Sequence, residues 1–193
     1  MKDDRFEATD RADWRTWLAA SRGRRDGVWL VSPKRSTGRV SLTYEEAIEE
    51  ALCFGWIDGQ TSTLDGARNA QWFAPRRRGS TWARSNKERV LRLEAAGLMT
   101  EAGRAAIRAA QADGSWTVLD SVEALEVPAD LAAALAARAG AREWFDSVSP
   151  SRRKMILGWI ATAKRPETRA ARIQDVASSV ALKQLPGPLR PRD

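Results

Sequence analysis

Residues 43–59, TYEEAIEEALCFGWIDG, determine the fold of the first half of the chain. Thr43 and Glu46 have the spacing of a capping box, which predicts that a helix starts directly after Thr43. Apolar residues then recur at helical spacing: Ala47, Ile48, Ala51 and Leu52. Glutamates occupy the opposite side, and Gly55 suits the left-handed residue that ends a helix. The stretch therefore predicts an amphipathic helix, closed by a glycine, with Trp56 directly behind it.

Short strands are predicted on both sides of this helix. Residues 28–32 form a buried apolar run, and residues 67–75 can return against residues 60–64 through the hairpin signal Asp65-Gly66. This pattern predicts an α+β fold with a small, mostly antiparallel sheet of about three strands, flanked by helices.

Helical patterns dominate the second half of the chain. We predict an α+β domain over residues 1–114, an acidic connector over residues 115–127 and an all-helical region over residues 128–183. Residues 184–193, with the sequence QLPGPLRPRD, are predicted to form a disordered tail that does not pack.

The composition excludes several kinds of chemistry. The 193 residues contain no histidine and one cysteine, Cys53, so Ser-His-Asp catalysis, Cys-His catalysis and a zinc site are not expected. Cys53 lies near the end of a helix, and it has neither a helix N-terminus nor a histidine partner, which predicts an inert, buried thiol. We expect no cofactor, and a non-enzymatic role is favoured over an enzymatic one. No apolar run could span a membrane and no secretory signal is present, which predicts a cytoplasmic protein.

Four stretches resemble a known bacterial family in order and spacing. They read SLTYEEAIEEALCFGWIDG, WFAPRRRGSTWARSNKERVLRLEAAGLMTEAG, VPADLAAAL and SPSRRKMILGWIATAKRPETRAARI. Together they resemble the YdeI/OmpD-associated (OmdA-like, bacteriocin-protection) family from about Trp14 to Val180. The resemblance implies a role in protection against bacteriocins or cationic antimicrobial peptides, and association with an outer-membrane porin.

The nine tryptophans suggest an aromatic binding surface, because tryptophan is seldom wholly buried. The family-like motifs bracket the predicted hairpin, so their aromatic, basic and polar residues could converge at one end of the sheet. These candidate ligand-binding residues are Trp56, Asp58, Trp72, Arg76, Arg77, Ser80, Trp82 and Asn86. Together they would hold an aromatic, amphipathic or anionic ligand by stacking and bidentate hydrogen bonds. For each of them a purely structural role is the alternative.

Three functions remain open from the sequence. The first is a non-catalytic protein that binds or sequesters an antimicrobial peptide, a bacteriocin or a small toxin in a pocket lined by tryptophan and arginine. The second is a nucleic-acid-binding protein, because the net charge is +7 and the basic residues are clustered. The third is an enzyme with a carboxylate, such as Asp58, in the tryptophan-rich cleft. The sequence leaves the oligomeric state open.

Overall fold

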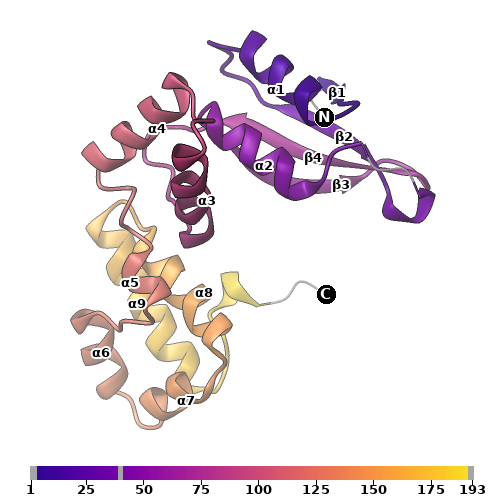
Figure 1. Cartoon of the computed structure of the whole chain (residues 1–193). Coiled ribbons are helices and arrows are strands. Elements are labelled where there is room, and N and C mark those ends of the chain that lie inside the picture. The colour runs from indigo at the N-terminus through magenta and orange to yellow at the C-terminus, as the bar shows by residue number, and fades with distance from the viewer. Residues whose placement is uncertain (1–3, 39–40, 191–193) are drawn as a thin grey trace. The chain divides into compact units, whose positions relative to one another are not determined.

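The computed structural model describes residues 4–38 and 41–190 (Figure 1). The chain forms two compact units, Met1–Trp116 and Thr117–Asp193. The first contains the sheet and the second is helical, which confirms the α+β class with helices at the C-terminal end. Among the described residues, no helix is both long and apolar enough to cross a membrane.

The sheet of the N-terminal unit has four strands rather than the three predicted. Their order is β1 (Arg5–Glu7), β2 (Val28–Pro33), β4 (Arg68–Pro75) and β3 (Trp56–Thr63). β2, β4 and β3 are antiparallel neighbours, whereas β1 runs parallel to β2. β1 could not be predicted from the sequence, because it has only three residues, too few to establish an alternating pattern.

Four helices complete the N-terminal unit, together with a 3₁₀ turn at Arg35–Thr37. They are α1 (Arg11–Ala20), α2 (Tyr44–Cys53), α3 (Arg84–Ala95) and α4 (Glu101–Ala112). α2 starts as predicted, because the Thr43 N–H donates to Glu46 Oε2 (2.9 Å) and the Glu46 N–H donates to Thr43 Oγ1 (3.2 Å). Gly55 behind it has a φ of 75°, the left-handed conformation predicted there.

Ser85 and Glu88 also have the spacing of a capping box, which predicts a helix that starts directly after Ser85, and this prediction is wrong. α3 already begins at Arg84, preceded by Ala83, which makes no side-chain cap. Glu88 therefore lies inside the helix, where it accepts a hydrogen bond from Arg84 Nε one turn earlier (2.9 Å).

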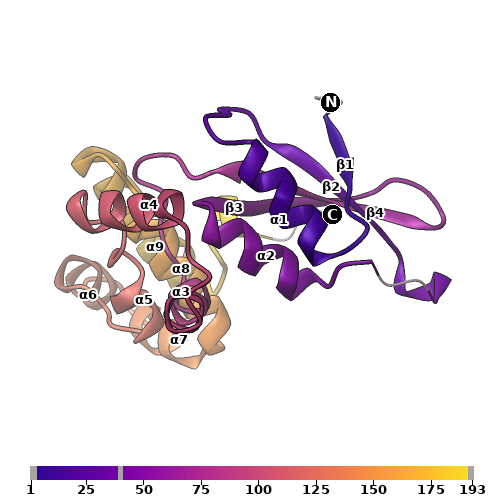
Figure 2. The ribbon, with the colours of Figure 1, turned by 45° about the horizontal axis from the view of Figure 1, so that its top comes forward.

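The main core of the N-terminal unit lies between one face of the sheet and the helices. Figure 2 shows α1 and α2 crossing the same face of the sheet. The largest fully buried side chains of this unit are Trp14, Trp82 and Phe73. Trp14 is satisfied inside the core, since its indole N–H donates to the carbonyl of Ala47 (3.1 Å). Several tryptophans thus serve as core residues among small alanines.

Glu50 is a charged residue in this core, with 2% of its surface exposed. Its carboxylate accepts hydrogen bonds from Arg11 Nε (2.7 Å) and Arg15 Nη1 (2.6 Å). Buried carboxylates require such partners, and this one joins α2 to α1.

The C-terminal unit is a small helical bundle with its own core. Its helices are α5 (Asp120–Glu123), α6 (Ala129–Ala136), α7 (Ala141–Ser147), α8 (Pro150–Ala161) and α9 (Pro166–Ala181). The most deeply buried side chains are Leu131, Leu135, Phe145, Ile156, Val176 and Val180. Each helix therefore buries one apolar face against its neighbours.

The ends of this unit differ from the predicted boundaries. Trp116 packs against the core of the N-terminal unit, whereas Val122 belongs to the core of the C-terminal unit, so the expected connector over residues 115–127 is divided between the two. Leu185 and Leu189 pack against the C-terminal core around a 3₁₀ turn at Gly187–Leu189. Of the tail expected to be disordered, the part up to residue 190 therefore has a described fold, and residues 191–193 lie outside the described residues.

Candidate functional site

Arg76, Arg77, Ser80 and Trp82, all predicted site residues, line one cavity of about 320 Å³ in the N-terminal unit. We call this cavity the arginine pocket. Its complete lining is Arg76, Arg77, Arg78, Gly79, Ser80, Trp82, Ala106, Ala109, Ala110, Ala112, Asp113 and Ser115. Three arginines thus line a small cavity together with Trp82 and with the alanines of α4.

Arg76 is the most unusual side chain of the arginine pocket. Its guanidinium carbon lies 3.5 Å from the centre of the Trp82 ring, and Nη1 donates to the carbonyl of Thr81 (3.2 Å). Nε and Nη2 are buried without a hydrogen-bond partner in the protein. Burial lowers the pKa of Arg76 to about 10, which still leaves the guanidinium protonated at neutral pH. The wall of the pocket therefore contains a buried positive charge with two donor atoms that no protein group accepts from.

The loop that carries Arg76 is held in place by backbone hydrogen bonds. The Arg76 N–H donates to the carbonyl of Gly55 (2.9 Å), which ties the end of β4 to the turn after α2. Gly79 has a φ of 75°, so a glycine is favoured at this turn. The Gly79 N–H donates to Asp113 Oδ2 (3.0 Å), and this carboxylate also accepts from the Ser115 N–H. Hydrogen bonds from Ser115 and Gly79 lower the pKa of Asp113.

This arrangement is suited to binding an anion that also has an apolar part. A carboxylate or phosphate can accept two hydrogen bonds from one guanidinium, and Arg–carboxylate pairs are often bidentate. The alanine side chains of α4 leave room for an apolar group beside the charge. Asp113, the one carboxylate of this lining, is already occupied by the backbone N–H groups of Gly79 and Ser115.

Trp56, Asp58 and Asn86 lie outside the arginine pocket. Trp56 is a core residue with 4% exposure, and its ring meets the edge of Trp17 at 5.6 Å. Asp58 accepts a hydrogen bond from the Tyr44 hydroxyl (3.0 Å), and Asn86 accepts one from Arg89 Nη1 (3.0 Å). The Tyr44–Asp58 contact connects α2 to β3, and the Arg89–Asn86 contact lies within α3. These contacts support the structural alternative for all three residues.

Trp72 lies on the opposite face of the sheet from Trp56. It packs edge-to-face against Trp29 at 5.2 Å in a small separate cluster. Two glycines make room for its ring, because a Cβ atom would lie 2.4 Å from Trp72 at Gly27 and 3.0 Å from it at Gly59. The structure thus brings four of the predicted residues together in one lining and leaves the others outside it. Asp58 is still near enough for its charge to raise the pKa of Arg76, against the larger effect of burial.

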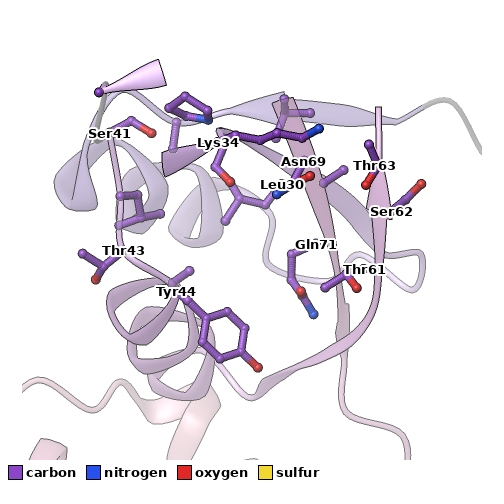
Figure 3. A pocket seen from close by; sticks show the side chains of 18 residues that line it. Leu30, Lys34, Ser41, Thr43, Tyr44, Thr61, Ser62, Thr63, Asn69 and Gln71 are labelled. Carbon is purple, nitrogen blue, oxygen red and sulfur yellow. The ribbon is translucent and has the colours of Figure 1, made fainter. Parts of the chain in front are cut away.

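A second cavity of about 960 Å³ lies next to the start of α2 and contains none of the predicted residues (Figure 3). We call it the hydroxyl cavity, because its polar lining is mainly Ser32, Ser41, Thr43, Tyr44, Thr61, Ser62, Thr63, Asn69 and Gln71. Figure 3 shows Ser41, Thr43 and Tyr44 on one side and Thr61, Ser62 and Thr63 on the other. Polar residues at every second position of β4, Asn69 and Gln71, indicate a polar face of the sheet, but they do not predict the cavity itself.

Cys53 is fully buried, and burial together with the nearby Glu50 raises the pKa of its thiol to about 11. A thiol with such a pKa is not a nucleophile at neutral pH. Among residues 4–38 and 41–190, no three His, Cys, Asp or Glu side chains gather in a geometry that could hold a metal ion.

Comparison with known families divides the chain as the structure does. Residues 6–106 match the family described as Domain of unknown function (DUF8412). Residues 124–182 match the family described as Bacteriocin-protection, YdeI or OmpD-Associated. This confirms the suspected family for the C-terminal region, whereas the motifs around Trp56 and Arg76 fall in the first match. No curated protein and no solved structure matches the chain significantly.

Proposed function

Because the chain belongs to the family described as Domain of unknown function (DUF8412) and carries a region of the Bacteriocin-protection, YdeI or OmpD-Associated family, we propose that it is a non-catalytic binding protein with a protective role. The family match supports a role related to bacteriocin protection in general terms. More specifically, the protein binds an acidic group of a bacteriocin, an antimicrobial peptide or a small toxin in the arginine pocket, and so sequesters the compound.

The observation that carries this proposal is the state of Arg76. A buried guanidinium with unpaired donors is costly, because charged groups lose their hydration on burial. Trp82 compensates for part of that loss by stacking against the guanidinium. A bound carboxylate would satisfy Nε and Nη2 with charge-assisted hydrogen bonds. A linear peptide that is not amidated has such a group at its C-terminus.

The clustered basic residues favour nucleic-acid binding when only the sequence is considered, but their ion pairs in the structure weaken this support. Within the basic stretch of residues 68–92, Arg68, Arg84, Arg89 and Arg92 form ion pairs with carboxylates of the same unit. Nucleic-acid affinity depends on arginines and lysines that are available to phosphates. Arg89 and Arg92 connect α3 to α2 through Glu45, whereas Arg68 and Arg84 pair within the hairpin and within α3.

An enzymatic role for Asp58 also has little structural support. Its carboxylate is held by the Tyr44 hydroxyl, and it does not line the arginine pocket. Cys53 is buried with a raised pKa, so it does not supply a nucleophile either. Binding therefore explains the arrangement of the site better than catalysis.

Calorimetric titration with benzoate and with the uncharged isostere benzamide tests the binding proposal. We expect saturable binding of benzoate and none of benzamide. Arg76→Met should weaken benzoate binding at least about tenfold, because hydrogen bonds to a charged group are lost. Arg22→Met removes an exposed arginine elsewhere on the unit and should leave the affinity unchanged. Equal binding of both compounds, or undiminished binding by Arg76→Met, would refute the proposal.

The protective role is tested in a bacterium that is sensitive to a bacteriocin. Cells that produce the wild-type chain should survive a bacteriocin concentration that kills cells producing Arg76→Met at the same protein level. Equal survival of the two strains would show that protection does not depend on the arginine pocket, even if the pocket binds benzoate.

A further inference from the structure

The hydroxyl cavity is a second site, and its lining shares no residue with the arginine pocket. Its volume of about 960 Å³ lies near the upper end of the range for cavities that hold small molecules. The chemistry of its walls also differs from that of the arginine pocket. Lys34 is the one charged residue among the described residues that line it.

The cavity exists because the side chains on one face of the sheet change from apolar to polar along the strands. On the face covered by α1 and α2, the sheet carries Val28, Trp56 and Phe73, which are buried in the core. Side chains alternate between the two faces of a sheet, so Ser32 of β2 and Asn69 of β4 lie on this same face, farther along the strands from the Val28–Phe73 pair. The apolar core therefore ends where α2 begins, and a polar wall continues on the same face.

Two rows of hydrogen-bonding side chains form this wall. Ser32 pairs with Asn69, and Asn69 pairs with Thr63 across the sheet. In the neighbouring row, Gln71 pairs with Thr61. Residues that pair directly in an antiparallel sheet project from the same face, so their hydroxyl and amide groups lie side by side. The wall offers several neutral donors and acceptors and no carboxylate.

The opposite wall adds an aromatic ring and an unsatisfied hydroxyl. Tyr44 is 57% exposed, and its hydroxyl is fixed by donation to Asp58 (3.0 Å). Its ring is thus held in place while much of it remains accessible. Ser41 Oγ is buried and has no hydrogen-bond partner in the protein. A buried hydroxyl without a partner is costly, so a ligand atom that bonds it would be favoured.

We infer that the hydroxyl cavity binds a short, uncharged saccharide. Sugar hydroxyl groups both donate and accept hydrogen bonds, as do the serine, threonine, asparagine and glutamine side chains of the wall. The apolar C–H faces of a sugar ring suit the Tyr44 ring and the nearby Leu30 and Leu42. A strongly charged ligand would find only Lys34 as a partner among the described lining residues.

The position of the cavity favours a saccharide over an extended peptide. Peptides that bind sheets usually pair with an edge strand through main-chain hydrogen bonds. In this sheet β1 and β3 are the edge strands, whereas the cavity lies on the face that carries the side chains of β2, β4 and β3. A ligand on that face meets side chains rather than free backbone groups.

Saturation-transfer NMR and calorimetry on the full chain test this inference. The probes are glucose, N-acetylglucosamine, maltotriose and diacetylchitobiose, with the N-acetylated amide of trialanine as a neutral peptide. We expect saturable binding of at least one saccharide and none of the peptide. Failure of all four saccharides to bind, or binding of the peptide alone, would overturn the inference.

Variants locate the binding and separate it from the arginine pocket. Asn69 is exposed on the cavity wall, and Asn69→Ala should weaken saccharide binding about fivefold, the effect of one neutral hydrogen bond. Thr63→Val, which keeps the side-chain shape, should act in the same direction if Asn69→Ala alters the fold. Gln111→Ala on the exposed side of α4 and Arg76→Met should leave saccharide affinity unchanged. A loss of affinity in Arg76→Met that equals the loss in Asn69→Ala would contradict two separate sites.

Discussion

Replacing Arg76 by methionine should leave the N-terminal unit about as stable as the wild type, although Nε and Nη2 of Arg76 are buried. Burial lowers the pKa of Arg76 well below its usual range, to about 10, and since a tenfold change in an equilibrium corresponds to about 1.4 kcal/mol, burial disfavours the charged form by about 3 kcal/mol. Arg76→Met removes that cost. It also removes the stacking on Trp82, worth about 2 kcal/mol when desolvated, and one hydrogen bond to Thr81.

These effects have opposite signs and similar size. Methionine also restores part of the contact with Trp82, because its thioether packs well against aromatic rings. We therefore expect the free energy of unfolding of Arg76→Met to lie within about 1 kcal/mol of the wild-type value. Benzoate binding should be lost at the same time. A residue that costs stability and provides binding is typical of a functional site.

The assay is urea denaturation at pH 7, followed by circular dichroism. Glu50→Gln is the matched control, because Glu50 is a buried charge that is fully engaged by Arg11 and Arg15. Loss of the Glu50 charge should lower the free energy of unfolding by about 2–3 kcal/mol. The unfolding transition that shifts in this variant is therefore that of the N-terminal unit. If Arg76→Met costs more than about 2 kcal/mol in the same transition, Arg76 is a structural residue and the reasoning is refuted.

Three further predictions follow from other parts of the N-terminal unit. Tyr44 is the one tyrosine of the sequence, and burial and its hydrogen bond to Asp58 raise its pKa above 10.0. Ultraviolet absorbance should therefore show tyrosinate only at higher pH, and Asp58→Asn should lower the midpoint of the tyrosine titration. The folded state holds this proton more tightly, so the contribution to stability is present below pH 10 and is lost as the pH rises through the folded pKa; an unshifted midpoint would contradict this. Gly103→Ala would place a Cβ 2.4 Å from the carbonyl of Cys53 and should cost about 1–3 kcal/mol in urea denaturation, whereas Gly66→Ala, with no atom nearby, should be nearly neutral. Cys53 should react with a thiol reagent at pH 8 only at the rate of unfolding, and rapid reaction in the folded protein would show that the thiol is accessible.

The sequence predicts best those features that depend on neighbouring residues. The capping box at Thr43 and the left-handed Gly55 are local, and both are confirmed. Arg76, Arg77, Ser80 and Trp82 line a common pocket because they lie within one short loop, where few conformations separate them. The Ser85 capping box fails because α3 starts at Arg84, two residues earlier than predicted, with Ala83 as its N-cap and the buried Trp82 just before it.

Features that depend on packing between distant segments were not predictable in the same way. Trp72 and Phe73 project from opposite faces of β4, but the sequence does not show which of these faces the helices cover. For this reason the sequence placed Trp72 with Trp56 in one candidate site, whereas the two side chains lie on opposite faces of the sheet. The hydroxyl cavity depends on where α2 begins relative to three strands, a relation that no local pattern contains.

The most direct test of the arginine pocket is an NMR titration of the arginine side-chain Nε–H signals with benzoate. The Arg76 signal is assigned by its absence from the spectrum of Arg76→Met. We predict that this signal shifts saturably with benzoate and does not shift with benzamide, because a carboxylate would accept its unpaired proton. An Arg76 signal that stays in place while signals of exposed arginines shift would contradict the proposed site.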